Sequence, residues 1–248
     1  MLYFCVPAYN EEQTIGITLY KLKEVMEDVR RDYKILVMDD KSDDGTWEAL
    51  KTYEKVLPLR AFQNEKNMGL GHCLRKFIEV VTAESQFPER DILITVESDY
   101  TSDTNAVPSM VRAIEEGMDV VIASGDVKGG EVKDAPFKVK FTTSVLHLLL
   151  RNLYAIEGVR DYLSMLRAYR VAVLKKLMKA DVDRMFLFRS KAANTELLVG
   201  LSILSPHIAE VPCTQRYDVR SRESRVKMPE LLVHHVRLVT RHWGDREA

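Results

Sequence analysis

The sequence predicts an α/β domain with a mostly parallel central sheet flanked by helices. Short apolar runs alternate with longer amphipathic segments, and this alternation is typical of βαβ units around a buried parallel sheet. The chain has 248 residues, of which 46% are hydrophobic, so it is long enough to bury a sizeable core. Polar residues gather directly after the apolar runs, where a parallel sheet binds its ligands.

The first half of the chain alternates expected strands with expected helices. Each strand is placed at a short apolar run, and each helix where apolar residues recur every three or four positions. In the first helix, Ile15, Leu19, Leu22 and Val29 fall on one face. The expected strands are 3–6, 35–38, 59–62, 92–96 and 120–123, and the expected helices are 15–29, 46–56, 70–81 and 107–116.

The second half of the chain is less regular. It begins with an expected loop that contains glycine and lysine and later includes a basic segment, at 125–136 and 216–227. We expect helices at 138–154, 172–180, 195–204 and 231–242, and a short strand at 209–212.

Composition excludes several classes of protein. The chain has 36 Lys+Arg against 37 Asp+Glu, a net charge of −1, so no overall positive field attracts nucleic acid. Its three cysteines have no CxxC spacing, which disfavours a disulfide framework or a structural zinc site. There is no signal-like segment and no uninterrupted run of about 18 to 20 apolar residues. We therefore expect a cytoplasmic protein without a membrane-spanning helix.

An acidic pair follows the fourth expected strand. Glu97 and Asp99 are separated by one residue, and two carboxylates at a strand end suit Mg²⁺ or Mn²⁺, which in turn holds a diphosphate. A solvated loop is the alternative, but three similarly polar loops follow the neighbouring strands and favour a site. None of the six histidines has metal-ligand spacing, so we interpret them as structural or surface residues.

A second acidic cluster follows the second expected strand. Asp39 and Asp40 stand where carboxylates accept hydrogen bonds from ribose hydroxyls or base nitrogens. Asp43 and Asp44 precede Gly45 at an expected turn, where acids also favour the N-terminus of a helix. We expect the first two to be functional and the other two to be at least partly structural.

Three arginines lie close together in the second half, at Arg160, Arg167 and Arg170. Guanidinium groups bind phosphate oxygens in pairs, so these residues suit an ionised phosphate ligand. The alternative is that some of them pair with Asp161 or coat the surface. A phosphate that is already ionised needs cations to hold it, whereas a hydroxyl group that is to react needs a base to remove its proton.

The order of the motifs resembles the family 2 glycosyltransferases of the GT-A fold, the Rossmann-like fold of nucleotide-diphospho-sugar transferases. The resemblance runs from about residue 3 to residue 228. Its later part looks like the dolichol-phosphate mannosyltransferase branch and related polyprenyl-phosphate glycosyltransferases. The matching segments are 6–12, 39–46, 67–71, 97–99, 159–170, 210–212 and 222–227.

The resemblance implies a role for particular residues. It places a metal on Glu97 and Asp99 at the family's DxD position, where Glu97 stands in place of the usual Asp. Later in the chain, Met165 stands where the family commonly has Gly. The implied donor-binding residues are Pro7, Tyr9, Glu11, Asp39, Asp40, Glu97 and Asp99. The implied catalytic residues are Asp99, Arg160, Ser164 and Arg167, and the implied acceptor-phosphate residues are Arg160, Ser164, Arg167, Arg222 and Lys227.

The resemblance also implies an activity and a division of the chain. The activity is inverting transfer of a hexose, with mannose from GDP-mannose favoured over a UDP-sugar, to a dolichyl or polyprenyl phosphate. Residues 1–228 would form one catalytic domain, with a nucleotide-sugar half (1–124) and an acceptor half (125–228), and 229–248 a C-terminal helix. Two alternatives stay open: a soluble hydroxyl acceptor, with Asp161 or Glu196 as base, and a subunit that binds nucleotide-sugar without catalysis.

The expected helix at 138–154 suggests how a lipid acceptor is met. One side of it is apolar, and basic residues Lys138 and Lys140 stand at its start, a combination that suits a helix at a membrane surface. Packing of the same helix on the core is the alternative. The apolar side comprises Phe141, Val145, Leu148, Leu149 and Leu153. We accordingly expect a peripheral protein at the cytosolic membrane face, held there by this helix or by a membrane-anchoring subunit.

Overall fold

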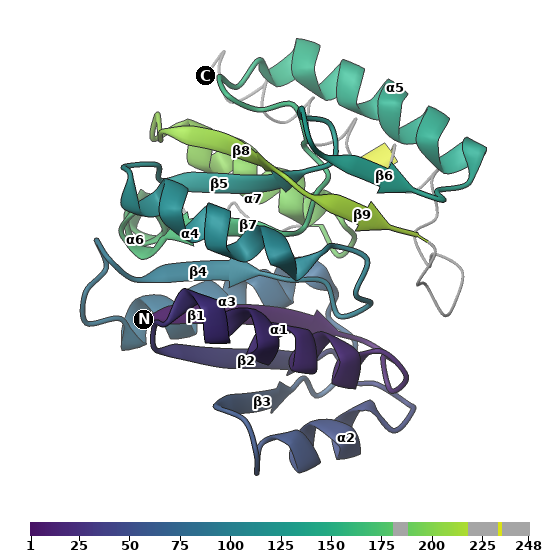
Figure 1. The fold of residues 1–248 in the computed structure, drawn as a ribbon, viewed down its shortest axis with the longest axis vertical. Helices are drawn as coiled ribbons and strands as arrows, with labels where there is room; N and C mark the ends of the chain where they lie inside the picture. The colour runs from purple at the N-terminus through teal and green to yellow at the C-terminus, as the bar shows by residue number, and fades with distance from the viewer. Residues whose placement is uncertain (181–187, 218–232, 235–248) are drawn as a thin grey trace.

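A seven-stranded sheet forms the centre of the protein, as Figure 1 shows. The structure is a computed structural model, and it describes residues 1–180, 188–217 and 233–234. Arg222, Lys227 and the expected C-terminal helix, except for residues 233–234, lie outside the described residues. The strands of the sheet are β1 (Leu2–Ala8), β2 (Tyr33–Asp39), β3 (Leu59–Gln63), β4 (Ile92–Thr95), β5 (Val120–Ser124), β7 (Arg167–Arg170) and β8 (Ile208–Pro212).

The strand order is β3-β2-β1-β4-β7-β5-β8, and β7 alone among these strands runs antiparallel to its neighbours β4 and β5. The prediction of an α/β fold with a mostly parallel sheet is therefore confirmed. A separate two-stranded ribbon is made by β6 (Glu131–Lys133) and β9 (Thr214–Arg216), which pair in parallel.

Helices cover both faces of the sheet. Three helices contribute buried residues to one core: α1 (Ile15–Val29), α2 (Thr46–Tyr53) and α4 (Val107–Glu115). The short 3₁₀ turn η1 (Thr104–Ala106) directly precedes α4. The helices α3 (Leu70–Glu84), α6 (Val171–Ala180) and α7 (Ala192–Ser202) pack in the other core. Side chains of β1 alternate between the two cores, with Phe4 in the first and Cys5 in the second, because successive residues of a strand face opposite sides.

The helix α5 (Phe137–Tyr154) lies at the end of the sheet beyond β8, far from β3 and α2 (Figure 1). Leu146, Leu150 and Tyr154 are buried in the second core, so one side of the helix packs on the protein. Its other side is exposed within the described structure, through Phe137, Phe141, Val145, Leu148 and Leu149. The core-packing interpretation of this helix is therefore confirmed for one side, which includes Leu153, and a place at a membrane surface stays a prediction.

No helix among the described residues combines the length and apolar character needed to cross a bilayer. The elements of the first half lie where the sequence predicted them, to within a few residues at their ends. In the second half the ribbon strands β6 and β9 and the central strand β7 were not expected. The sequence of β7 is Arg-Ala-Tyr-Arg. This strand is largely buried, but because it contains two arginines it lacks the apolar run that predicts a buried strand.

Two glycines with positive φ allow a matched test of packing. A Cβ at Gly69 (φ 87°) would lie 2.7 Å from the backbone Cα of Arg189, whereas a Cβ at Gly117 (φ 114°) would meet nothing within 4 Å. Both Gly→Ala changes strain the backbone by about 1–3 kcal/mol. We expect Gly69→Ala to lower the free energy of unfolding, measured with urea, by about 1–3 kcal/mol more than Gly117→Ala because of this clash. Equal losses would show that the segment around Arg189 moves away without cost.

Candidate active site

The candidate site lies at the carboxyl ends of β1, β2 and β4. Ala8 pairs with Asp39 and Cys5 with Thr95, so the loops after these three strands emerge at the same edge. Here β1 lies between β2 and β4, and the strand order reverses direction. Ligands of open α/β sheets bind at such a switch point. The predicted donor-binding residues therefore gather at one edge, with Pro7 in β1 itself.

Hydrogen bonds join the loop after β1 to the loop after β2. The Asn10 amide N–H donates to Ser42 Oγ at 2.8 Å, and the Asp43 amide donates to Asn10 Oδ1 at 2.9 Å. The Glu11 amide donates to Thr46 Oγ1 at 2.8 Å, and Thr14 Oγ1 donates to the buried Glu11 carboxylate at 2.6 Å. Tyr9, which directly follows β1, is half-buried. Glu11 thus fixes the shape of this edge.

The carboxylates of Asp39 and Asp40 are buried and hydrogen-bonded within the protein. Asp39 accepts from Ser42, through both its hydroxyl and its amide, and from Gln63 Nε2 at 2.8 Å. Asp40 accepts from the Gly69 amide and the Met68 amide, both at 2.7 Å, and from Asn64 Nδ2 at 2.7 Å. In this arrangement Asp40 fixes the loop between β3 and α3. Contact of either residue with a ribose or base stays a prediction.

Glu97 and Asp99 follow β4 and are both partly exposed. Ser102 Oγ donates to Glu97 at 2.9 Å, and Thr101 donates to Asp99 Oδ1 through its hydroxyl at 2.6 Å. Glu97 also forms an ion pair with Lys191, the residue that precedes α7. No local pattern predicts this contact, because Lys191 lies 94 positions away from Glu97 in the chain. The pair places a cation beside the predicted metal ligands.

These carboxylates fit a divalent cation that is shared with a diphosphate. Within the described residues no group of three or more His, Cys, Asp or Glu side chains is arranged to hold a metal. Mg²⁺ characteristically binds one or two protein carboxylates and takes its other ligands from phosphate oxygens and water. Asp99 and Glu97 meet that requirement by residue type and by their place at the strand end. At Glu97 a metal ion would compete with the Lys191 ammonium for the carboxylate.

The segment at 188–191 lies against the loop that precedes α3. The Leu70 amide donates to the Arg189 carbonyl at 2.8 Å, and the Arg189 guanidinium donates to the Asn67 carbonyl at 2.6 Å and to Asn67 Oδ1 at 3.0 Å. Arg189 and Lys191 therefore bring two cations of the second half of the chain to the donor edge. Neither residue belongs to a motif, so only the tertiary structure reveals them.

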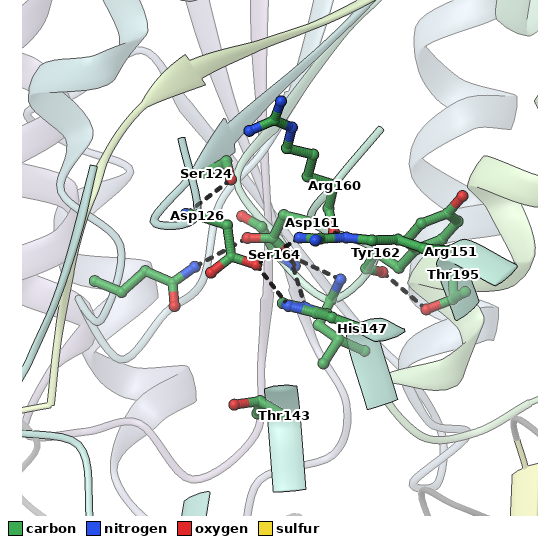
Figure 2. A network of polar contacts seen from close by, with 12 residues as sticks. Ser124, Asp126, Thr143, His147, Arg151, Arg160, Asp161, Tyr162, Ser164 and Thr195 are labelled. Atoms are coloured by element: carbon green, nitrogen blue, oxygen red, sulfur yellow. Dashed lines mark hydrogen bonds and ion pairs between the residues drawn. The ribbon is translucent and has the colours of Figure 1, made fainter. Parts of the chain in front are cut away.

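The three predicted acceptor-side residues within the described part of the chain differ in their surroundings. Arg160 is exposed, and its side chain points away from the polar network drawn in Figure 2. Ser164 is buried and donates its hydroxyl hydrogen to the Ala123 carbonyl at 2.7 Å. Arg167 is wholly buried, and its guanidinium donates to the carbonyls of Asn194 at 2.7 Å and Tyr162 at 2.8 Å. Arg160 is thus the one of the three that faces solvent.

The guanidinium of Arg170 is also held by contacts within the protein. Its guanidinium donates to the backbone carbonyls of Ile114 at 2.6 Å and Met118 at 2.8 Å and pairs with Asp119 at 3.3 Å. The sequence-based alternative, that some of the clustered arginines pair with Asp161 or coat the surface, fits neither residue. Arg167 is wholly buried and the acid beside Arg170 is Asp119, and both guanidinium groups donate to backbone carbonyls. What joins these two is their place in β7, where strands pack on both sides.

A doubly wound α/β sheet with polar loops at its switch point is an architecture that many nucleotide-binding proteins share. The comparisons narrow this class. The sequence model of glycosyl transferase family 2 matches residues 3–178. The chain belongs to glycosyl transferase family 2.

Two curated relatives illustrate the similarity. The chain is 27% identical over 225 residues to the dolichol-phosphate mannosyltransferase of Pyrococcus furiosus, covering 90% of this chain and 58% of that protein. It is 25% identical over 209 residues to the undecaprenyl-phosphate 4-deoxy-4-formamido-L-arabinose transferase of Pseudomonas fluorescens, covering 84% and 55%. The chain thus spans little more than half the length of these relatives.

Solved structures agree in fold. Glucosyl-3-phosphoglycerate synthase from Mycobacterium tuberculosis has a TM-score of 0.63 and 19% identity, covering 97% of this chain and 81% of that one. The S. aureus TarS 1–349 structure in complex with UDP has a TM-score of 0.58 and 21% identity, covering 96% and 64%. These structural neighbours are GT-A glycosyltransferases, and the expected GT-A fold is confirmed.

The contrast between Arg167 and Arg160 is testable through stability. Arg167→Met removes the two hydrogen bonds that the buried guanidinium donates to the carbonyls of Asn194 and Tyr162, and the Tyr162 carbonyl keeps only the Thr195 hydroxyl as a side-chain donor. Since hydrogen bonds from a charged donor are worth about 1.5–3 kcal/mol each, we expect a loss of about 2–4 kcal/mol in the free energy of unfolding. Arg160→Met, at an exposed position, should change that free energy by no more than about 0.5 kcal/mol. Urea unfolding followed by circular dichroism measures both. Similar values for the two variants would contradict the structural role of Arg167.

Proposed function

We propose that this protein transfers a hexose from a nucleotide diphosphate sugar to a dolichyl or polyprenyl phosphate, with inversion at the sugar carbon. GDP-mannose is the favoured donor. The observation that carries the proposal is that acidic and basic side chains lie in separate places in the same domain. Carboxylates suited to a metal-bound diphosphate lie at the carboxyl edge of the sheet, and the exposed Arg160 stands on a loop that Arg151 joins to α5.

The donor side rests on Glu97, Asp99 and the two cations of the second half. A divalent cation at Asp99, when bound, would neutralise charge on the departing nucleotide diphosphate. Lys191 and Arg189 add positive charge at the same edge, which also favours a diphosphate. In solved neighbours UDP-GlcNAc binds to TarS, and Mg²⁺ binds together with UDP to the synthase of M. tuberculosis. We therefore include UDP-sugars among the donors to be tested.

The acceptor side favours a phosphate over a hydroxyl. The two candidate bases, Asp161 and Glu196, are buried, with 2% and 4% of their surface exposed. Burial alone would raise the pKa of Asp161, but the ion pair with His147 and the hydrogen bonds from the Ser164 and Leu163 amides hold that pKa below its usual value. A carboxylate so placed is a poor proton acceptor for a soluble substrate. An ionised phosphate needs no base, and Arg160 supplies an exposed cation to bind it.

The reaction then has a simple balance. A phosphate oxygen of the acceptor forms a bond to the anomeric carbon of the sugar, on the face opposite the leaving group. The bond from that carbon to the nucleotide diphosphate breaks, and its electron pair leaves with the diphosphate. No proton has to be removed from the nucleophile, because a phosphate monoester is ionised at neutral pH. The role of the protein is to position the two anions and to offset their charge.

The exposed face of α5 supports an encounter with lipid. Two aromatic and three aliphatic side chains are exposed there, and Lys138 and Lys140 are exposed near its N-terminus. An amphipathic helix of this kind lies in a membrane interface with its basic residues toward anionic head groups. We propose that the protein acts at the cytosolic face of a membrane, either alone or with an anchoring subunit. Both similar curated relatives are named for polyprenyl-type phosphate acceptors.

Labelled donors would test the proposed function directly. The protein is incubated with GDP-mannose, UDP-glucose or UDP-GlcNAc, each with dolichyl phosphate or undecaprenyl phosphate in detergent, with Mn²⁺ or with EDTA. Label in the organic phase supports the proposal, and its dependence on Mn²⁺ supports the metal. A water-soluble product would favour a hydroxyl acceptor instead. Donor binding without turnover would favour the alternative of a non-catalytic subunit.

Asp99 should be required for transfer. We expect Asp99→Asn to lower kcat/KM by about 100- to 1,000-fold, because it removes the charge that holds the cation at the leaving group. Asp103→Asn is the matched control, since Asp103 caps the turn at η1 through the Asn105 amide, a role that asparagine also fills. Steady-state rates and thermal unfolding would be measured together. An active, metal-dependent Asp99→Asn variant would rule out the metal assignment.

Arg160 should act on the acceptor alone. Arg160→Met removes a charge-assisted contact with phosphate of about 1.5–3 kcal/mol, so the KM for the lipid phosphate should rise about 10- to 100-fold. The dissociation constant of the donor, measured by calorimetry, should not change. A rise in both constants would place Arg160 at the donor instead.

A further inference from the structure

The loop that carries Arg160 is held by charged groups from two other segments, β8 and α5, and by its own Asp161. The Glu210 carboxylate on β8 accepts from the amides of Arg160 and Asp161, both at 2.6 Å. The Asp161 carboxylate accepts from the amides of Leu163 at 2.9 Å and Ser164 at 2.8 Å. Arg151 on α5 donates to the Arg160 carbonyl at 2.8 Å. The backbone on both sides of Arg160 is therefore fixed by side chains distant in sequence.

His147 links one of these acids, Asp161, to a further acid, Asp126, as Figure 2 shows. Its Nδ1 lies 2.8 Å from Asp126 Oδ2, in the segment after β5, and its Nε2 lies 3.3 Å from Asp161 Oδ1 in an ion pair. Arg151, one helical turn later on α5, pairs with the same Asp126 carboxylate at 3.1 Å. One face of α5 thus presents two cations to a pair of acids, while another face carries the exposed apolar residues.

The charge of His147 follows from these neighbours. Burial by itself would lower the pKa of His147, but the carboxylates of Asp126 and Asp161 outweigh burial and raise the pKa to about 9. The other charged groups of the network are Arg151 and Glu210. Burial raises the pKa of Glu210. The imidazole is therefore protonated at neutral pH. Loss of its proton would leave Asp126 and Asp161 with Arg151 as the remaining nearby side-chain cation of the network.

We propose that His147 is a positioning residue for the acceptor phosphate: by joining Asp126 to Asp161 it fixes the loop on which Arg160 meets the phosphate. This inference rests on the proposed function, since it concerns the same acceptor. His147 does not touch the phosphate in this account. It acts through Asp161, whose carboxylate holds the amides that follow Arg160, and α5 thereby joins the lipid-facing surface to the phosphate-binding loop.

The pH dependence has a definite sign. The pKa of His147 in the folded protein lies above that of an unfolded histidine, about 6.5. Its stabilisation of the loop is therefore complete below about pH 6.5 and is lost as the pH rises through about 9. The KM for lipid phosphate should accordingly increase as the pH passes this range.

The test compares His147→Gln with the wild-type protein and with His207→Gln, using dolichyl or undecaprenyl phosphate in detergent and the preferred donor. His207 is a suitable control because it is 79% exposed and its partner is Asp119, outside the network. For His147→Gln we expect a KM for lipid phosphate at pH 7 that is about tenfold higher, with kcat within about threefold and an unchanged donor dissociation constant. The rise in KM near pH 9 should vanish in this variant and persist in His207→Gln.

An unchanged KM, or a pH step that survives in His147→Gln, would overturn the inference, as would equal losses in kcat and donor affinity. If His147→Gln fails to fold, Asp126→Asn replaces it and should show the same change in KM at pH 7, because it removes one of the two acids that His147 joins. Nitrogen-15 NMR of the histidine rings provides a readout that needs no turnover. The His147 ring should stay protonated above pH 8 in the wild type and titrate lower in Asp126→Asn.

Failure of the inference and failure of the proposed function are distinguishable. Without any lipid product from the wild type, the proposed function fails, whatever the NMR shows. With lipid product from the wild type but an unchanged acceptor KM in the variant, the inference alone fails. A His147 ring that is neutral at pH 7 would likewise overturn the inference while leaving the transferase proposal intact.

Discussion

Buried carboxylates that accept hydrogen bonds from backbone amides are the interactions on which this structure depends. Asp40 holds the loop before α3, and Asp161 and Glu210 hold the loop around Arg160. Loops at the carboxyl edge of a parallel sheet cannot all satisfy their amides with each other, and an unpaired buried amide costs about 1–3 kcal/mol. An acid at the end of a strand answers this need. The same acids give the edge its negative charge, so structural support and ligand chemistry draw on one residue type.

Cations from distant parts of the chain balance this charge. Lys191 pairs with Glu97 at the donor edge, and His147 and Arg151 face Asp126 and Asp161 on the acceptor side. The net charge of −1 is therefore the sum of acidic and basic groups that gather at particular sites in the structure. In the proposed reaction two anionic substrates must approach each other, and fixed cations near each of them reduce the cost of that approach.

Much of the fold was predictable because apolar periodicity is a local property of the sequence. The first five strands and four helices lie where the pattern placed them, and the acids of the edge follow from their position after those strands. The roles of particular side chains were harder to predict. Arg160 and Arg167 belong to one motif, yet the first is exposed and the second is wholly buried. Residue type indicated phosphate binding for both, and burial separates them.

The sequence by itself determined the alternation of strands and helices, the acidic edge and the family to which the chain is similar, since each depends on residues close together in the chain. Only the tertiary structure decided that Arg167 lies inside a mixed sheet, that Lys191 meets Glu97 across 94 positions, and that His147 joins Asp126 to Asp161. The physical reason is that burial and ion pairing depend on which surfaces pack together. Packing brings together residues that no local pattern connects.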